Sequence, residues 1–466
     1  MFTPFRFFLP LALLLGGLLV FITPPFQSPD EYNHFFRAFQ VSEGHFSPET
    51  WNNNRLGGHL PNSLDSFKTT FLPLKGNYTA KTSPQEVLDV LSLRLNAGDA
   101  RFLDFPNTAI YAPTGYIPQA IGIALARNFT DRCLVLFYVA RLFNLLFWTA
   151  LVWAALQRMP FQRQTMAFLA LLPASLAVAS SCNADVLTNG LAFYAVAVFC
   201  GLVHRVTQTQ QVTLSRPLNN PREGVAIGVV ALIALNKLVF APMALLAGLA
   251  ELDRGTSWKT ALRRSFGPLI LAFTLAIWWG IKAQNWFIPY DRYDPVVRDM
   301  QTLNPGVDPQ AQTRFILEHP VVFVETVAVS FARAMPSTAA HFVGKFGWEK
   351  NYLPGWLILF LWLGLFALVF TEKNQLSRAQ RLWTGGIVLV CVWLWAATMY
   401  TLWCPVGARE LDNWQGRYFV PVAPLVALAV GVGWGQRWEK WVLPATFFVL
   451  VAGNFMLLVA VLQRYY

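Results

Sequence analysis

Residues 7–38 read FFLPLALLLGGLLVFITPPFQSPDEYNHFFRA. The first part of this stretch, residues 7–26, is a long apolar run that follows Arg6 and carries no small-residue cleavage signature. Such a run predicts an uncleaved first membrane span with its N-terminus in the cytoplasm. Asp30 and Glu31 come directly after the run, so we expect two adjacent carboxylates at the external membrane surface.

The composition is that of a polytopic membrane protein. Of 466 residues, 55% are hydrophobic and only 13% are charged. Because lipid cannot satisfy backbone polar groups and the apolar runs do not alternate, we expect helices and not a barrel. The net charge of +11 does not indicate nucleic acid, since the basic residues fall in short loops where they orient the spans. The five cysteines have no metal-like spacing, so we expect neither a disulfide framework nor a zinc site.

The apolar runs and the alternation of basic loops predict an all-α integral membrane protein with about eleven transmembrane helices. Two large external regions interrupt the spans, and each is expected to carry an interfacial helix. The predicted spans are 7–26, 133–156, 164–181, 186–203, 224–235, 238–250, 266–287, 353–370, 382–403, 418–434 and 441–462.

This pattern divides the chain into three parts. Residues 1–288 form a transmembrane module that includes the first external loop, 27–131. Residues 289–353 form a second external region with an amphipathic helix near 314–335, and residues 354–466 form the C-terminal transmembrane helices.

Three local patterns refine the topology. Residues 30–41 place Phe side chains on one side and polar residues on the other, so we expect a helix lying along the interface. Residues 110–125 are apolar but short and interrupted by prolines, and the positive-inside rule favours a segment that dips into the near leaflet over one that spans. Residues 224–250 predict a hairpin of short helices whose tip carries Lys237 on the external side.

Ionisable residues near membrane depth cost several kcal/mol unless they are paired or hydrated, which makes them functional candidates. One acidic centre among separated cations suits a carboxylate that activates a hydroxyl while Lys and Arg hold a leaving phosphate. Under the predicted topology these residues gather at the external face: Asp30, Glu31, Arg141, Asp185, Lys237, Lys345, Arg409, Glu410 and Arg417.

A set of motifs spread along nearly the whole chain carries a family resemblance. They are Pro24-Pro25-x-x-x-Pro29-Asp30-Glu31-x-x-His34-x-x-Arg37-Ala38, Tyr111-x-Pro113-x-x-Tyr116-x-Pro118, Ala140-Arg141-Leu142-x-Asn144, Asn183-x-Asp185, Lys237-x-x-x-x-Pro242, Phe342-x-Gly344-x-x-Gly347-Trp348 and Gln415-Gly416-Arg417-Tyr418-Phe419-x-Pro421. Together they resemble the bacterial multipass membrane proteins of the domain of unknown function 2142 family. That family looks like a branch of the GT-C glycosyltransferase superfamily.

The resemblance implies an enzyme of the bacterial inner membrane with its active site on the external face. It would transfer a sugar from a polyprenyl-phosphate donor to a glycan or lipid acceptor, with inversion. Asp30 would be the catalytic carboxylate, or Glu31 if the neighbour does the work, and Lys237 and Arg417 would bind the carrier phosphate. Further candidates are Lys345 and Arg141 for the donor, and Asp185, His34, Trp348 and Tyr418 as supporting or acceptor-site residues.

Simpler explanations stand beside these roles. Asp30 and Glu31 suit the first turn of any helix, and Asp185 suits a helix cap. Arg417 and Lys237 could snorkel, and Arg141 could pair with an acid inside the bundle. His34, about one turn beyond Asp30, could orient that carboxylate, ligate a metal or be an ordinary surface histidine. No cluster has the spacing of a metal site, so a divalent metal requirement stays open.

Two rival functions also remain open. A transporter or flippase of lipid-linked glycans would bind the same phosphate without bond chemistry. A non-catalytic assembly subunit would tolerate the loss of Asp30.

Overall fold

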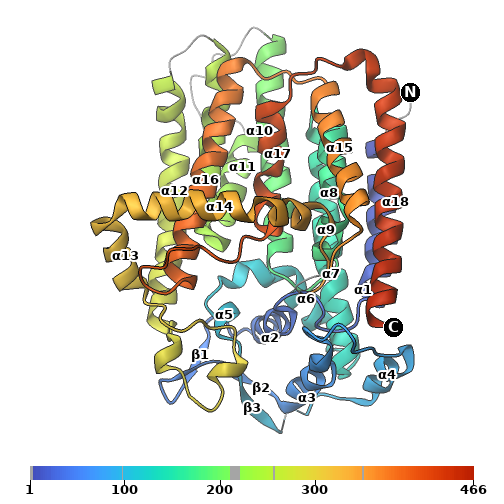
Figure 1. Ribbon diagram of the computed structural model, residues 1–466, viewed down its shortest axis with the longest axis vertical. Helices are drawn as coiled ribbons and strands as arrows, with labels where there is room; N and C mark the ends of the chain where they lie inside the picture. The colour runs from blue at the N-terminus through green and yellow to red at the C-terminus, as the bar shows by residue number, and fades with distance from the viewer. Residues whose placement is uncertain (1–3, 97, 210–220, 255–257, 349–350) are drawn as a thin grey trace.

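The computed structural model describes residues 4–96, 98–209, 221–254, 258–348 and 351–466. Most helices run side by side in a bundle, and residues 24–131 cover one end of it, which we call the capped end (Figure 1). Within these described ranges, six helices are long and apolar enough to cross a membrane. They are α1 (Phe8–Ile22), α7 (Cys133–Arg158), α10 (Asp185–Thr209), α12 (Trp258–Trp286), α16 (Arg378–Trp403) and α18 (Glu439–Tyr465).

The other predicted spans fall on elements that are short or broken. The span predicted at 164–181, for example, divides into two helices because Pro173 cannot continue the first of them. A count of about eleven crossings therefore stays a prediction. These elements are α8 (Arg163–Ala170), α9 (Pro173–Ala179), α11 (Pro221–Asn236), η5 (Leu238–Arg254), α15 (Gly355–Thr371), η8 (Gly416–Val422) and α17 (Ala423–Val430).

The element η5 is a 3-10 helix of 17 residues, which sequence patterning did not predict. A 3-10 helix rises about 2.0 Å per residue, so η5 extends roughly 34 Å, which is enough to cross a bilayer core of about 30 Å. An α-helix of the same length would reach only about 26 Å. The predicted hairpin is present, and Lys237 lies at the break between α11 and η5.

The capped end contains a small antiparallel sheet that was not expected. Its strands β1 (Glu49–Trp51), β2 (Arg55–Pro61) and β3 (Ala100–Asp104) pair in the order β1-β2-β3. Short helices surround the sheet: α3 (Asn62–Phe71), η2 (Leu72–Leu74), α4 (Pro84–Asp89), η3 (Val90–Ser92), α5 (Pro106–Ala109), η4 (Pro113–Tyr116) and α6 (Ile117–Ala126).

Two predictions for the capped end have different outcomes. The helix α2 (Glu31–Ser42) exists, but residues 31–41 are all buried, so the prediction that it lies along the membrane interface is wrong. It packs against α6 and α5 instead, inside the cap. The segment 110–125 does not form a spanning helix, because α6 has 10 residues and extends only about 15 Å.

The second polar region contains η6 (Tyr290–Arg292), η7 (Arg298–Met300), α13 (Pro309–Glu318) and α14 (Pro320–Gly344). We predicted one amphipathic helix here, but Pro320 divides it, and the two helices meet at 105°. The longer helix, α14, runs across the bundle and not along it (Figure 1). The buried Tyr293 accepts a hydrogen bond from the Leu56 backbone at 2.9 Å, which joins this region to the sheet.

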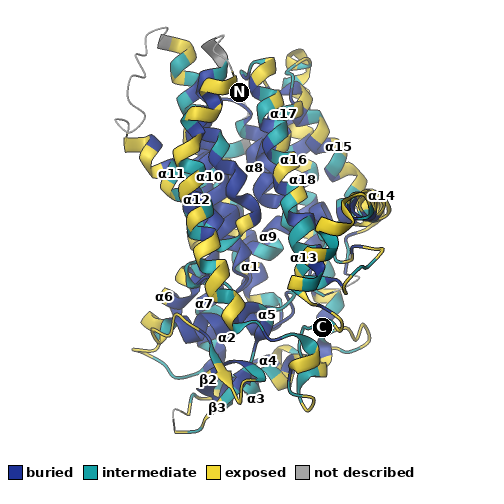
Figure 2. Ribbon diagram, turned by 90° about the vertical axis from the view of Figure 1, so that its left-hand side faces the viewer, coloured by how far each residue is buried: buried dark blue, intermediate teal, exposed yellow. Residues whose placement is uncertain are grey.

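Burial separates inner from outer helices, as Figure 2 shows. In the most apolar 18-residue stretch of α10, 83% of the residues are buried. In the corresponding stretch of α12, only 11% are buried. Many exposed side chains of α12 are large and apolar, among them Phe266 and Ile281. A wide apolar surface of this kind suits contact with lipid chains and not with water.

Candidate functional site

A cavity of about 940 Å³ lies where the capped end meets the bundle. Residues from α2, α10, α12, α14, α16, η8 and the break between α11 and η5 line it. Eight of the ten residues to which the family resemblance gave a role line this cavity: Asp30, His34, Asp185, Lys237, Lys345, Trp348, Arg417 and Tyr418. We call this space the main cavity.

Asp30 presents its carboxylate to the main cavity. The residue has a left-handed backbone (φ 60°), which aspartate tolerates better than most residues. It is the N-cap residue of α2, yet its side chain makes no capping hydrogen bond. The carboxylate is 20% exposed, and its Oδ2 lies 3.6 Å from Nη2 of Arg417.

Glu31 points the opposite way and is fully buried against Arg141. Both of its oxygens accept hydrogen bonds from Arg141, at 2.8 and 2.7 Å, and Oε1 also accepts one from the Cys182 backbone. Neither Glu31 nor Arg141 lines the main cavity. The alternatives that Glu31 is the base and Arg141 a phosphate ligand are therefore corrected: these two residues form an internal ion pair.

The guanidinium of Arg141 also forms hydrogen bonds at the C-terminal end of α1. Arg141 donates to the carbonyl oxygens of Val20, Thr23 and Pro24, at 2.9, 2.7 and 3.2 Å. Carbonyls at the end of a helix lack partners within the helix, so these bonds satisfy them. The pair thus fixes the turn that carries Asp30 into the cavity.

Asp185 and Lys237 form a second ion pair, inside the main cavity. Asp185 is the first residue of α10, and Lys237 lies just before η5, so two helix N-termini meet here. A third N-terminus, that of η8, begins beside Arg417. Helix N-termini carry partial positive charge, which adds to the attraction of this region for an anion.

Arg417 is only partly satisfied by the protein. Its Nη2 donates to the Tyr418 hydroxyl at 3.3 Å, but its Nε and Nη1 are buried without a hydrogen-bond partner. The same holds for Nδ1 of His341 and Nδ2 of Asn236, which belong to other residues lining the main cavity. Buried donors without partners are costly, so this group of atoms is suited to a bound anion or ordered water.

His34 is buried beneath Asp30, with Nδ1 2.9 Å from the Tyr116 hydroxyl. Burial, the largest effect, lowers the pKa of His34 to about 4, and nearby Asp30 and Asp185 oppose that shift. The imidazole is therefore neutral at pH 7. The ring lines the main cavity without adding a positive charge. Because His34 is buried, the alternative of a surface histidine is wrong.

Part of the lining of the main cavity is apolar. Ala276 and Trp279 of α12 and Met399 and Leu402 of α16 contribute to it. Trp395 and Trp414 pack with centroids 4.5 Å apart near Tyr418. The cavity is thus amphipathic, since its lining combines charged groups with aromatic and aliphatic groups.

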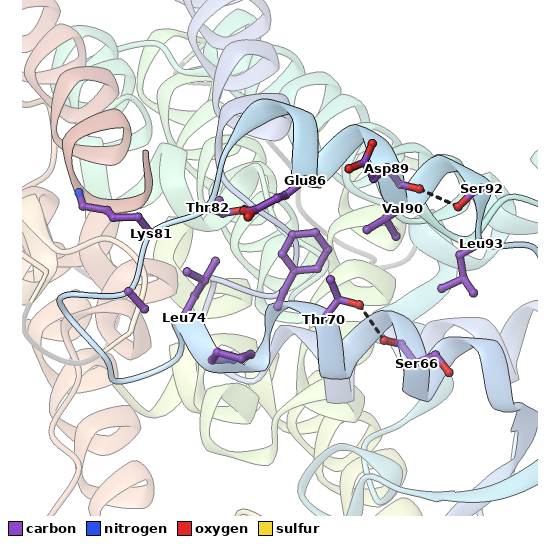
Figure 3. Close-up of a pocket in the computed structure, with 13 residues that line it drawn as sticks. Ser66, Thr70, Leu74, Lys81, Thr82, Glu86, Asp89, Val90, Ser92 and Leu93 are labelled. Carbon is purple, nitrogen blue, oxygen red and sulfur yellow. Dashed lines mark hydrogen bonds between the residues drawn. The ribbon is translucent and has the colours of Figure 1, made fainter.

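A second hollow, of about 600 Å³, lies in the cap between α3 and α4 (Figure 3). Its polar groups already bond one another: Thr70 donates to the Ser66 carbonyl and Ser92 to the Asp89 carbonyl, at 3.0 and 2.7 Å. Thr82 donates to Glu86 at 2.9 Å. These groups are satisfied without a ligand, in contrast to those around Arg417.

Comparison with known proteins agrees with this architecture. The sequence model of the DUF2142 family, described as a predicted membrane protein, matches residues 13–426. The chain belongs to the DUF2142 family. No curated protein and no solved structure matches this DUF2142 protein. The family assignment supports a membrane protein, in agreement with the apolar helices of the bundle.

Sequence reasoning did not nominate several residues of the site in this DUF2142 member. Tyr111 and Asn236 line the cavity. Tyr111 begins one quoted motif and Asn236 directly precedes another, so position in or next to a motif was the available signal. His341 likewise directly precedes a quoted motif, and the fold places it in the same lining as Arg417. Within the described ranges, no group of three or more His, Cys, Asp or Glu side chains is arranged to hold a metal ion.

Proposed function

We propose that this DUF2142 protein is a GT-C-type membrane glycosyltransferase that uses a polyprenyl-phosphate sugar as donor. The observation that carries the proposal is the approach of Asp30 to Arg417, whose Nε and Nη1 lack partners. A carboxylate able to take a proton therefore lies beside donors able to hold a phosphate. The reaction class needs both groups within one cavity.

The amphipathic lining supports a lipid-linked substrate. The donor phosphate and sugar would occupy the charged side near Lys237 and Arg417, while the polyprenyl chain would lie along the apolar side formed by α12 and α16. Aromatic rings such as Trp395, Trp414 and Tyr418 would contact the apolar face of the sugar. A small hydrophilic metabolite would leave the apolar side unused.

In the proposed reaction, Asp30 accepts the proton of an acceptor hydroxyl, and the hydroxyl oxygen attacks the anomeric carbon. The bond from that carbon to the phosphate oxygen breaks, and polyprenyl phosphate leaves with the bonding electron pair. Arg417 and Lys237 stabilise the charge on this leaving group. Attack opposite the leaving group inverts the anomeric configuration.

The proposal includes the topology predicted from sequence, with about eleven crossings in the bacterial inner membrane. The capped end would face the outside, where a glycan or lipid acceptor is available. The loops that join α7 to α8, α15 to α16 and α17 to α18 would then be cytoplasmic, as the positive-inside rule favours. They and the adjoining helix ends carry Arg158, Arg163, Lys373, Arg378, Arg381, Arg437 and Lys440.

The test is sugar transfer by purified protein in lipid nanodiscs. A panel of labelled polyprenyl-phosphate sugars is supplied with membrane glycolipids, and release of polyprenyl phosphate is measured together with labelled product. Asp30→Asn should reduce transfer by at least about a thousandfold, and Asp65→Asn, an exposed acid in the cap, is the matched control. Full transfer by Asp30→Asn would overturn the proposal. Movement of the labelled lipid across the bilayer without any product would favour a flippase.

A further inference from the structure

A small side chamber of about 50 Å³ adjoins the main cavity. Five residues line both spaces: Pro29, His341, Lys345, Gln415 and Arg417. Residues of α9, such as Ala177, and Gly416 also line the chamber, whereas Asp185 and Lys237 do not.

The lining of the chamber is basic and partly unsatisfied. Arg417 and Lys345 contribute positive charge, and His341 contributes an imidazole. Three buried nitrogens among these side chains have no hydrogen-bond partner: Nε and Nη1 of Arg417 and Nδ1 of His341. Acidic side chains do not line it within the described residues. The chamber therefore offers donors and positive charge with no resident anion.

Its size restricts the ligand. A water needs about 10–15 Å³ of this kind of volume, so the chamber holds about three to five waters or one compact group of similar size. A sugar ring or a lipid chain is larger. A tetrahedral phosphoryl group matches both the volume and the donors.

We propose that the side chamber binds a second phosphoryl group, so that the lipid substrate of this protein is carried on a diphosphate. One phosphoryl group lies in the main cavity near Lys237, and the second lies in the side chamber near His341 and Lys345. Arg417 borders both spaces and bridges the two groups, as a planar guanidinium with several donors can do. This inference rests on the proposed lipid-phosphate substrate and specifies its anionic part.

Binding measurements test the inference without requiring any transfer reaction. Farnesyl monophosphate and farnesyl diphosphate serve as soluble probes, and their affinities for the detergent-purified full chain are measured by calorimetry. The wild-type protein should bind the diphosphate at least about tenfold more tightly, since charge-assisted hydrogen bonds are added. The three variants Lys345→Gln, His341→Phe and Ala177→Met should abolish this preference. Ala177 does not line the main cavity, so Ala177→Met, which fills the chamber without removing charge, should also leave monophosphate binding unchanged.

Lys68→Gln, in the cap, is the matched control and should keep the preference. Equal affinity for the two probes in the wild-type protein would overturn the inference, as would an unchanged preference in all three chamber variants. Tighter binding of the monophosphate when inorganic phosphate is added would assign the chamber to a separate phosphate and would also overturn it. The sugar-transfer assay is therefore repeated with diphosphate-linked donors. Failure of transfer from both donor types with an intact diphosphate preference would contradict the proposed reaction alone.

Discussion

The Nη2 atom of Arg417 lies 3.6 Å from Oδ2 of Asp30, although the two residues are far apart in the chain. Arg417 reaches this position from η8, and Asp30 from the turn before α2. The contact leaves Nε and Nη1 of the same guanidinium without partners. The ion pair therefore uses only part of the hydrogen-bonding capacity of Arg417.

Replacement of Arg417 should weaken binding of phosphate-bearing lipids. Arg417→Lys keeps the charge but loses the planar fork, so we expect affinity for farnesyl monophosphate to fall by about tenfold, and Arg417→Gln should lose more. Calorimetry on purified variants checks this, with the surface substitution Arg94→Gln as control. Unchanged affinity in Arg417→Gln would show that Arg417 has only a structural role.

Glu31→Gln should destabilise the protein. The change leaves the buried Arg141 charge uncompensated, which costs about 3–5 kcal/mol for a buried pair. We expect a clear drop in the thermal unfolding midpoint, and the double variant Glu31→Met/Arg141→Met should regain part of the loss. A Glu31→Gln protein with native stability and no activity would instead restore Glu31 as a candidate base.

The different positions of the neighbours Asp30 and Glu31 show what could not be predicted from the sequence. The polar break at Lys237 and the cluster of charged residues were predictable, because lipid makes unpaired polar groups costly wherever they occur in a span. Which of Asp30 and Glu31 faces the main cavity could not be predicted. It depends on the left-handed backbone at Asp30 and on the pairing of Glu31 with Arg141, which lies 110 residues away in the chain. Likewise, no local pattern distinguishes a 3-10 helix such as η5 from an α-helix.

Protonation of His34 should destabilise the folded protein at low pH. The folded-state pKa of His34 is about 4 because burial disfavours the charged form, whereas the unfolded value is near 6.5. The unfolded state therefore binds more protons between these values, and stability from this group falls by up to about 3 kcal/mol as the pH drops from 6.5 to 4. Thermal unfolding of wild type and His34→Gln across this range checks the prediction. If the unfolding midpoints of wild type and His34→Gln changed in the same way with pH, the prediction would be contradicted.

Substitution of Lys237 and substitution of Asp185 should change the affinity for inorganic phosphate in opposite directions. Lys237→Gln removes a cation from the main cavity and should lower the affinity for inorganic phosphate several-fold. Asp185→Asn removes the anion that competes for Lys237, so affinity should rise. Phosphate titrations of both variants, with folding checked by gel filtration, test the pair. A fall in affinity for both would mean that Asp185 supports the site by positioning Lys237.

Gly416→Ala should disturb the position of Arg417 without removing any charged group. A Cβ atom at residue 416 would lie 2.2 Å from the backbone nitrogen of Phe342, so α14 and η8 must separate to accommodate it. Because Arg417 follows directly, we expect weaker lipid-phosphate binding together with a lower unfolding midpoint, since packed backbones relax only partly. Gly386→Ala on α16 is the control, because a Cβ there meets nothing within 4 Å. If Gly416→Ala bound farnesyl monophosphate with wild-type affinity, the close packing of α14 on η8 would not be what positions Arg417.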